Sequence, residues 1–237
     1  MVAAAVAFSG CAATEVAIEH KDLKVETKMS ATVFLDVENR TAKTIFVDLK
    51  NTSDKEMDVR PLIESRLVSA GYSIVPNAQD AFYILQGNIL QVGTADPSAL
   101  QSALGAGFGG PVAGMAIGGV IGMNSHSMMG GYNGAAIGGL VGGAGELIAG
   151  SLVKNVTFSM ITDLQIMERT PEAVSQTVNS NLQQGTGTQV VQTSASTRNR
   201  RKYQTRIVST ANQVNLKFET ALPVLQEQLA KSIAGIF

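Results

Sequence analysis

The sequence has no tryptophan, and it contains only one cysteine and two histidines among its 237 residues. One cysteine excludes an intrachain disulfide, and His20 and His126 are too few for a multi-histidine metal site. The P-loop, HExxH and CxxC patterns that mark phosphate, zinc and redox chemistry are also absent. A net charge of −1 offers no electrostatic attraction for nucleic acid. We therefore expect a protein that is not an enzyme, uses no cofactor or metal and binds no nucleic acid.

Charged residues are absent between Asp96 and Glu146, the region that also holds most of the chain's 24 glycines. Two apolar segments, residues 103–123 and 134–153, flank a polar turn. A helix as long as the first segment spans about 31 Å, close to the thickness of a bilayer's hydrocarbon core. We predict that residues 97–153 form a hydrophobic helical hairpin that crosses or enters a membrane. A buried helical hairpin and a glycine-rich loop are the alternatives.

Glycine recurs every four residues in both apolar segments, a spacing that lets helices approach closely in lipid. One row contains Gly110, Gly114, Gly118 and Gly122, and the other contains Gly130, Gly134, Gly138 and Gly142. Glu146 is one step further along the second row, and an intramembrane carboxylate usually faces protein or water. We expect the rows to pack the helices of a homo-oligomer and Glu146 to be buried among them. Alternatively, the membrane boundary falls earlier and leaves Glu146 among the headgroups.

The N-terminus leads through small and apolar residues to Phe8, Ser9, Gly10 and Cys11. This segment resembles the lipobox of bacterial lipoproteins, which implies a signal peptide at residues 1–10 and a lipid on Cys11. Because Ala12 rather than Asp follows the cysteine, the resemblance implies the outer membrane. No Lys or Arg precedes the apolar run, although signal peptides begin with a basic region, so we expect the true start to lie upstream. An unmodified, buried Cys11 is the alternative.

The flanks of the glycine-rich stretch are ordinary in composition and predict one α+β domain. Strands are expected from β-branched and aromatic content or from alternation, and helices from apolar residues three and four apart. The expected strands cover residues 32–37, 44–50, 72–75, 81–92, 154–166 and 203–218, and the expected helices cover residues 58–70 and 219–236. Residues 31–96 and 154–237 thus form the domain, the hairpin is inserted between its strands, and residues 11–30 are a lipidated tether or short helix.

A basic cluster at residues 198–202 stands apart from the other charges of the second flank. Such a cluster is typical of a solvated turn between strands. The alternative is a contact with anionic lipid headgroups.

Several segments resemble, in the same order, those of the TraT family of complement-resistance and surface-exclusion lipoproteins. They are residues 23–30 (LKVETKMS), 51–55 (NTSDK), 160–163 (MITD), 202–206 (KYQTR), 214–219 (VNLKFE) and 228–234 (QLAKSIA). The resemblance implies a lipid-anchored, surface-exposed outer-membrane homo-oligomer. Such a protein hinders donor cells from forming stable mating contacts, and it interferes with complement. Its partner is either the donor's mating apparatus or an outer-membrane protein. An oligomeric outer-membrane pore or a component of a transport assembly is the alternative function.

We expect the substitution Cys11→Ser to abolish lipidation and to release the protein from the outer membrane without unfolding it. The reason is that one membrane signal alone gives marginal binding, whereas two give stable anchoring. Mass spectrometry of the protein from native outer membranes measures the modification. An unmodified Cys11 in those membranes would contradict the assignment.

Overall fold

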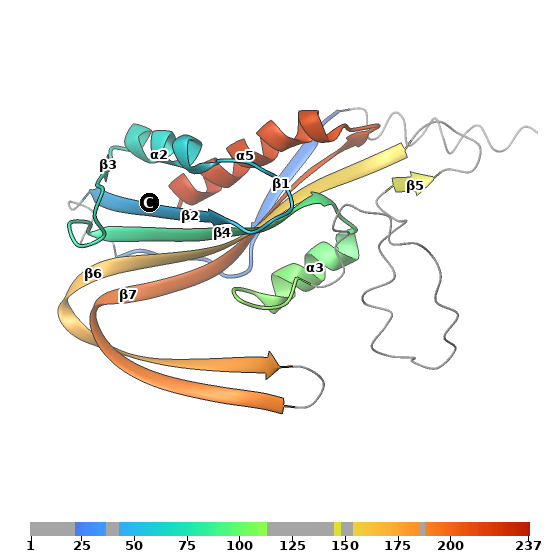
Figure 1. Cartoon of the computed structure of the whole chain (residues 1–237). Helices are drawn as coiled ribbons and strands as arrows, with labels where there is room; N and C mark the ends of the chain where they lie inside the picture. Colours follow the sequence, from blue (N-terminus) through green and yellow to red (C-terminus); the bar gives the residue numbers. More distant parts are fainter. Residues whose placement is uncertain (1–21, 37–42, 113–144, 148–153, 185–187) are drawn as a thin grey trace, which may run out of the picture.

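The structure is a computed structural model and describes residues 22–36, 43–112, 145–147, 154–184 and 188–237. Its elements are β1 (Lys24–Met29), β2 (Thr44–Asn51), α2 (Arg60–Ser69), β3 (Ser73–Ile74), β4 (Tyr83–Thr94), α3 (Pro97–Ala106), β5 (Gly145–Leu147), β6 (Lys154–Gln184), β7 (Thr188–Val214) and α5 (Phe218–Ala234). The strands form one seven-stranded sheet in the order β1-β7-β6-β4-β2-β3, and β5 pairs with β6. Helices α2 and α5 cover one face of this sheet, and α3 lies on the other (Figure 1).

The main core lies between the sheet and the pair α2 and α5. Alternate residues of β6 point into it, as period-2 alternation in a half-buried strand requires, and they include Phe158, Met160, Leu164 and Ile166. Helix α5 contributes its apolar stripe, of which Leu225, Leu229 and Ile233 are buried. The sequence predicted both patterns, and it predicted β2, α2, β3, β4 and α5 to within two residues at each end. Strand β6 begins at the predicted residue but continues to Gln184, well beyond the predicted end at residue 166.

The opposite face carries a smaller cluster beneath α3. This helix buries Leu100 and Ala103 against Ile161 and Val208 of the sheet. Its N-terminus is capped because the Asp96 carboxylate accepts hydrogen bonds from the backbone N–H and the hydroxyl of Ser98, at 2.8 and 2.5 Å. Proline follows as the first helical residue, where no donor is lost.

The predicted fold class, an α+β domain with an inserted transmembrane hairpin, is wrong. The structure is instead a strand-rich, strongly curved sheet with three short helices in its described residues. None of those helices is both long and apolar enough to span a bilayer. Helix α3 ends at Ala106, because Gly107 and Gly109 adopt φ of +67° and +71° and break the helical path. On the second apolar segment, Glu146 lies in β5 rather than in a helix, opposite Asn155 of β6.

Other local predictions also need correction. Residues 24–29, expected in a tether or short helix, form the edge strand β1 and pair with β7. The strand expected at residues 32–37 is not found over the described residues 32–36. Tertiary pairing decides both cases, because an isolated stretch of either composition can adopt either state.

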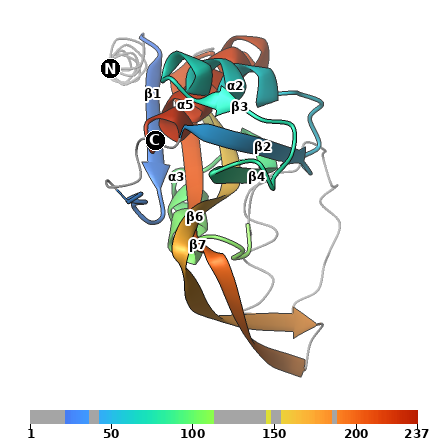
Figure 2. The same cartoon turned by 90° about the vertical axis from the view of Figure 1, so that its left-hand side faces the viewer.

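Strands β6 and β7 are much longer than their neighbours and continue past the sheet as a two-stranded arm. Their pairing runs from Asn155↔Val214 to Gln184↔Thr188, with one register shift between Arg169 and Val174. The arm bends and curves below the sheet on the side of α3 (Figures 1 and 2). It includes residues 175–184 and 188–197.

Candidate functional site

A buried ion pair joins β6 and β7 on the face that carries α3. Asp163 and Arg206 lie directly opposite each other in the strand register, and Arg206 is 0% exposed. The guanidinium donates through Nε to Oδ1 of Asp163 at 2.6 Å and through Nη2 to Oδ2 at 3.0 Å. This two-point geometry is the strongest form of an arginine–carboxylate contact.

The same two side chains hold the turn that follows α3. Arg206 also donates to the backbone oxygens of Ala103 at 3.1 Å and Gly110 at 2.7 Å, while Asp163 accepts from the Gly109 N–H at 2.8 Å. Gly110 itself packs so closely that an added Cβ would lie 2.4 Å from the carbonyl oxygen of Ala106. Two hydrogen bonds to the ion pair therefore hold the turn at residues 107–110, and a third holds Ala103 of α3.

A row of amide side chains crosses the same face beside this turn. Gln204 donates to Gln165 at 2.8 Å, Gln165 donates to Gln86 at 3.0 Å, and Gln86 donates to the Asp48 carboxylate at 3.3 Å. These four residues sit directly opposite one another on β7, β6, β4 and β2. We call them the amide row. Cross-strand pairing produces it, because residues in register on one face stand side by side.

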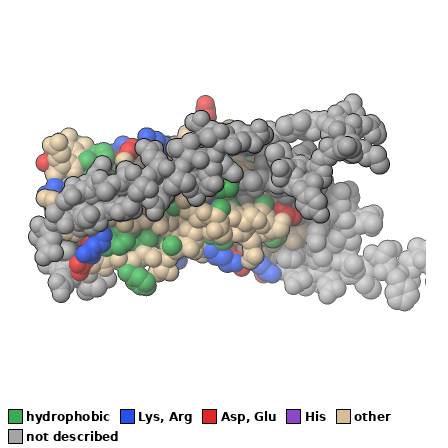
Figure 3. Space-filling model, turned by 90° about the horizontal axis from the view of Figure 1, so that it is seen from below, with side chains coloured by type: hydrophobic (Ala, Val, Ile, Leu, Met, Phe, Trp, Pro, Cys, Tyr) green, Lys and Arg blue, Asp and Glu red, His purple; other side chains and the backbone are tan. Residues whose placement is uncertain are grey.

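A hollow of about 330 Å³ lies over the amide row. Its lining combines three members of the row, Asp48, Gln86 and Gln165, with Lys50, Asn88, Leu90 and Phe108. Phe108 belongs to the turn at residues 107–110 and is 38% exposed. Seen from this side, the described surface mixes polar and hydrophobic side chains, and charged ones lie mainly toward its margins (Figure 3). We regard this hollow as the candidate site, because its lining combines hydrogen-bonding side chains with an exposed aromatic ring.

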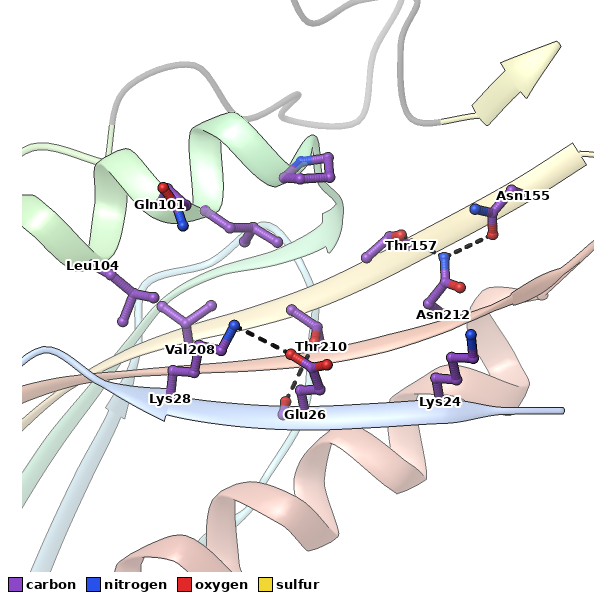
Figure 4. A pocket seen from close by; sticks show the side chains of 12 residues that line it. Lys24, Glu26, Lys28, Gln101, Leu104, Asn155, Thr157, Val208, Thr210 and Asn212 are labelled. Atoms are coloured by element: carbon purple, nitrogen blue, oxygen red, sulfur yellow. Dashed lines mark hydrogen bonds and ion pairs between the residues drawn. The ribbon is translucent and has the colours of Figure 1, made fainter. Parts of the chain in front are cut away.

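A second cleft of about 400 Å³ separates α3 from β1 (Figure 4). Its polar wall is largely engaged within the protein: Lys28 pairs with Glu26 at 3.3 Å, and the Asn212 amide donates to Asn155 and Thr157, both at 2.7 Å. Both side chains of the Lys28–Glu26 pair are exposed, so this ion pair is weak.

A buried carboxylate occupies the other face of the sheet, near the start of the arm. Glu168 is 0% exposed and accepts hydrogen bonds from the hydroxyls of Tyr203 at 3.0 Å and Tyr83 at 3.5 Å. Burial, and then the charge of Glu168, raise the pKa of Tyr83 far above its usual value. Burial likewise raises the pKa of Tyr203. The two phenol hydroxyls therefore stabilise this carboxylate through hydrogen bonds.

The basic cluster at residues 198–202 is not a turn, because it lies within β7. Arg200 donates to the backbone oxygens of Phe82, Ala78 and Ala81 at 2.9–3.1 Å. Arg201 lies 3.6 Å from the Asp36 carboxylate. Burial lowers the pKa of Arg200. At least these two arginines therefore serve the fold, which argues against the cluster as a headgroup site.

Most residues singled out in the sequence are not brought together. Cys11 lies outside the described residues, and so do all the glycines of the two predicted rows except Gly110. Gly110 belongs to the fixed turn and not to a helix. Glu146 lies on β5, and its side chain is not described.

Sequence reasoning missed the ion pair, the amide row and the role of Phe108. Both members of the pair lie inside segments that carry the family resemblance, MITD and KYQTR. That shared location was the available signal. Nothing local indicated that the two charges face each other.

Comparison with known proteins gives a consistent result. Residues 22–237 match the family described as the enterobacterial TraT complement resistance protein. A TraT complement resistance protein of Escherichia coli is 43% identical over 238 residues, covering 100% of this chain and 96% of that relative. The one from strain K12 is also 43% identical, over 95% of its length. A Wigglesworthia glossinidia brevipalpis relative with the same name is 28% identical over 96% of this chain and 90% of its own.

Removing one member of the buried pair should be strongly destabilising. We expect Arg206→Met to lower the free energy of unfolding by about 3–5 kcal/mol, because Asp163 remains buried without its partner. The double variant Arg206→Met/Asp163→Leu should lose less than the sum of the two single variants. Denaturant unfolding measures all three.

The control is Arg60→Met, which breaks the exposed pair with Glu64 and should cost at most about 1 kcal/mol. Equal losses for Arg206→Met and Arg60→Met would contradict a structural role for the buried pair.

The buried tyrosine predicts a loss of stability in alkali. The folded protein holds the Tyr83 proton more tightly than the unfolded chain, so stability is complete below the unfolded pKa of about 10 and falls as pH rises beyond it. Tyr83→Phe should be less stable at neutral pH but should show a flatter profile between about pH 9 and 11. Urea titrations across this range test the slope, and parallel profiles for the two proteins would rule the explanation out.

Proposed function

The chain belongs to the TraT family of complement resistance proteins, and from this membership we propose that it obstructs contact at the bacterial surface rather than catalysing a reaction. The observation that carries the proposal is the match over residues 22–237, which takes in every described element from β1 to α5. A role in obstruction needs a stable exposed domain and no reactive centre.

The fine details of the proposal come from the resemblance. The protein is anchored in the outer membrane by lipid on Cys11, exposed on the cell surface and assembled as a homo-oligomer. There it hinders donor cells from forming stable mating contacts, and it reduces complement deposition. Its partners are outer-membrane lipid and either the donor's mating apparatus or an outer-membrane protein.

The architecture supports a non-catalytic role. The guanidinium of Arg206 is buried, and it donates its hydrogen bonds to Asp163, Ala103 and Gly110. The candidate hollow is lined by amides, two carboxylates and one ammonium, with no histidine, cysteine or serine among its lining residues. The lining therefore offers no Ser–His or Cys–His pair that could act as an activated nucleophile.

The pore alternative depended on two glycine-rich helices to line a channel. Helix α3 ends at Ala106, and Glu146, the one carboxylate assigned to such a lining, lies on β5. That premise is lost, and a pore is not proposed.

Conjugation into recipient cells tests the function directly. Recipients expressing the protein should receive severalfold less DNA than empty-vector recipients from donors of at least one exclusion group. They should also survive active serum better, with no difference in heat-inactivated serum. Cys11→Ser is the matched control, because it should keep the fold and lose the surface position.

Surface labelling first establishes that the wild-type protein reaches the cell surface. Equal transfer from every donor group, together with equal serum survival, would then refute the proposal.

A further inference from the structure

The hollow over the amide row is nearly uncharged yet rich in hydrogen-bonding groups. Lys50 balances Asp48 within the lining, and Asp163 is neutralised by Arg206. Each glutamine of the row donates one N–H to its neighbour. Because an amide carries two N–H donors and an oxygen with two lone pairs, each retains further hydrogen-bonding capacity toward a ligand.

Phe108 provides an aromatic wall at a fixed position. It stands between Gly107 and Gly109, whose backbone adopts the left-handed conformation. Only glycine adopts that conformation at little cost. The turn is held to the sheet through the Gly109 N–H and the Gly110 oxygen. Only two other large hydrophobic side chains in the described residues are comparably exposed, Phe34 and Val68. A ring left exposed on a rigidly held turn, beside polar groups, indicates recognition rather than packing.

We propose that this hollow binds a neutral saccharide, whose C–H face stacks on the Phe108 ring while its hydroxyls bond to the amides of Gln86 and Gln165 and to the Asp48 carboxylate. The electron-rich face of an aromatic ring attracts the weakly positive C–H groups of a sugar. Hydroxyls both donate and accept, so they suit a lining in which amides, a carboxylate and an ammonium alternate.

Other ligand classes fit less well. A phosphate or nucleotide needs net positive charge, which the lining lacks. An extended peptide binds by adding a strand at a sheet edge, whereas this hollow lies on the face of the sheet over β2, β4 and β6. This proposal does not rest on the exclusion function, because it concerns only the ligand that the domain binds.

Saturation-transfer NMR with the full-length protein tests the proposal, in a detergent that has no sugar headgroup. The probes are the methyl glycosides of glucose, galactose, mannose and N-acetylglucosamine at millimolar concentration, because shallow sites bind weakly. A neutral hexapeptide serves as the comparison ligand. We expect transfer to at least one glycoside, strongest at ring protons of a single face, and none to the peptide.

Variants locate the site. Phe108→Ala should weaken binding about tenfold, equivalent to about 1.4 kcal/mol, and Phe108→Trp should retain it. Gln86→Met removes amide donors from the floor at similar volume and should also weaken binding. Phe34→Ala is the matched control, because Phe34 is 79% exposed and does not line the hollow.

Thermal unfolding first verifies that each variant is folded. Three results would overturn the proposal: no transfer to any glycoside, transfer that Phe34→Ala and Phe108→Ala change equally, or transfer to the peptide instead. None of these results bears on the conjugation and serum assays, so the two proposals fail separately.

Discussion

The pairing of Arg206 with Asp163 is the contact on which the α3 side of the molecule depends. A buried guanidinium is costly unless its donors are satisfied, and here they reach one carboxylate and two backbone oxygens. Those oxygens belong to α3 and to the turn after it, so the charge pair attaches both to the sheet. The position of Phe108 and the shape of the hollow follow from this attachment.

The two faces of the sheet are stabilised in different ways. The face under α2 and α5 is an apolar core with aromatic edges, such as the contact between Tyr83 and Phe237 at 5.4 Å between ring centroids. The face under α3 combines a small apolar cluster with the ion pair and the amide row. Hydrophobic burial is non-directional, whereas hydrogen bonds require defined geometry. The second face is therefore the one suited to selective recognition.

The segments that carry the resemblance are spread along the chain but meet in space. Residues 23–30 lie beside β7, where the Ser30 N–H donates to the Arg206 oxygen at 2.9 Å. The last residue of MITD, Asp163, lies opposite the last residue of KYQTR, Arg206. Because these segments are distant in sequence but hydrogen-bonded to one another, the same contacts of the fold constrain them.

The sequence by itself determined the family, the alternating strands and the helices α2 and α5, because periods of 2 and 3.6 and short segments are local properties. It could not determine that the charge-free stretch begins as the short α3, since glycine-rich apolar residues fit several environments equally well. Only the tertiary structure decided which polar residues meet. Asp163 and Arg206 are 43 positions apart, and Phe108 meets the amide row only after four strands align. Strand register is a long-range property, and it placed these side chains together.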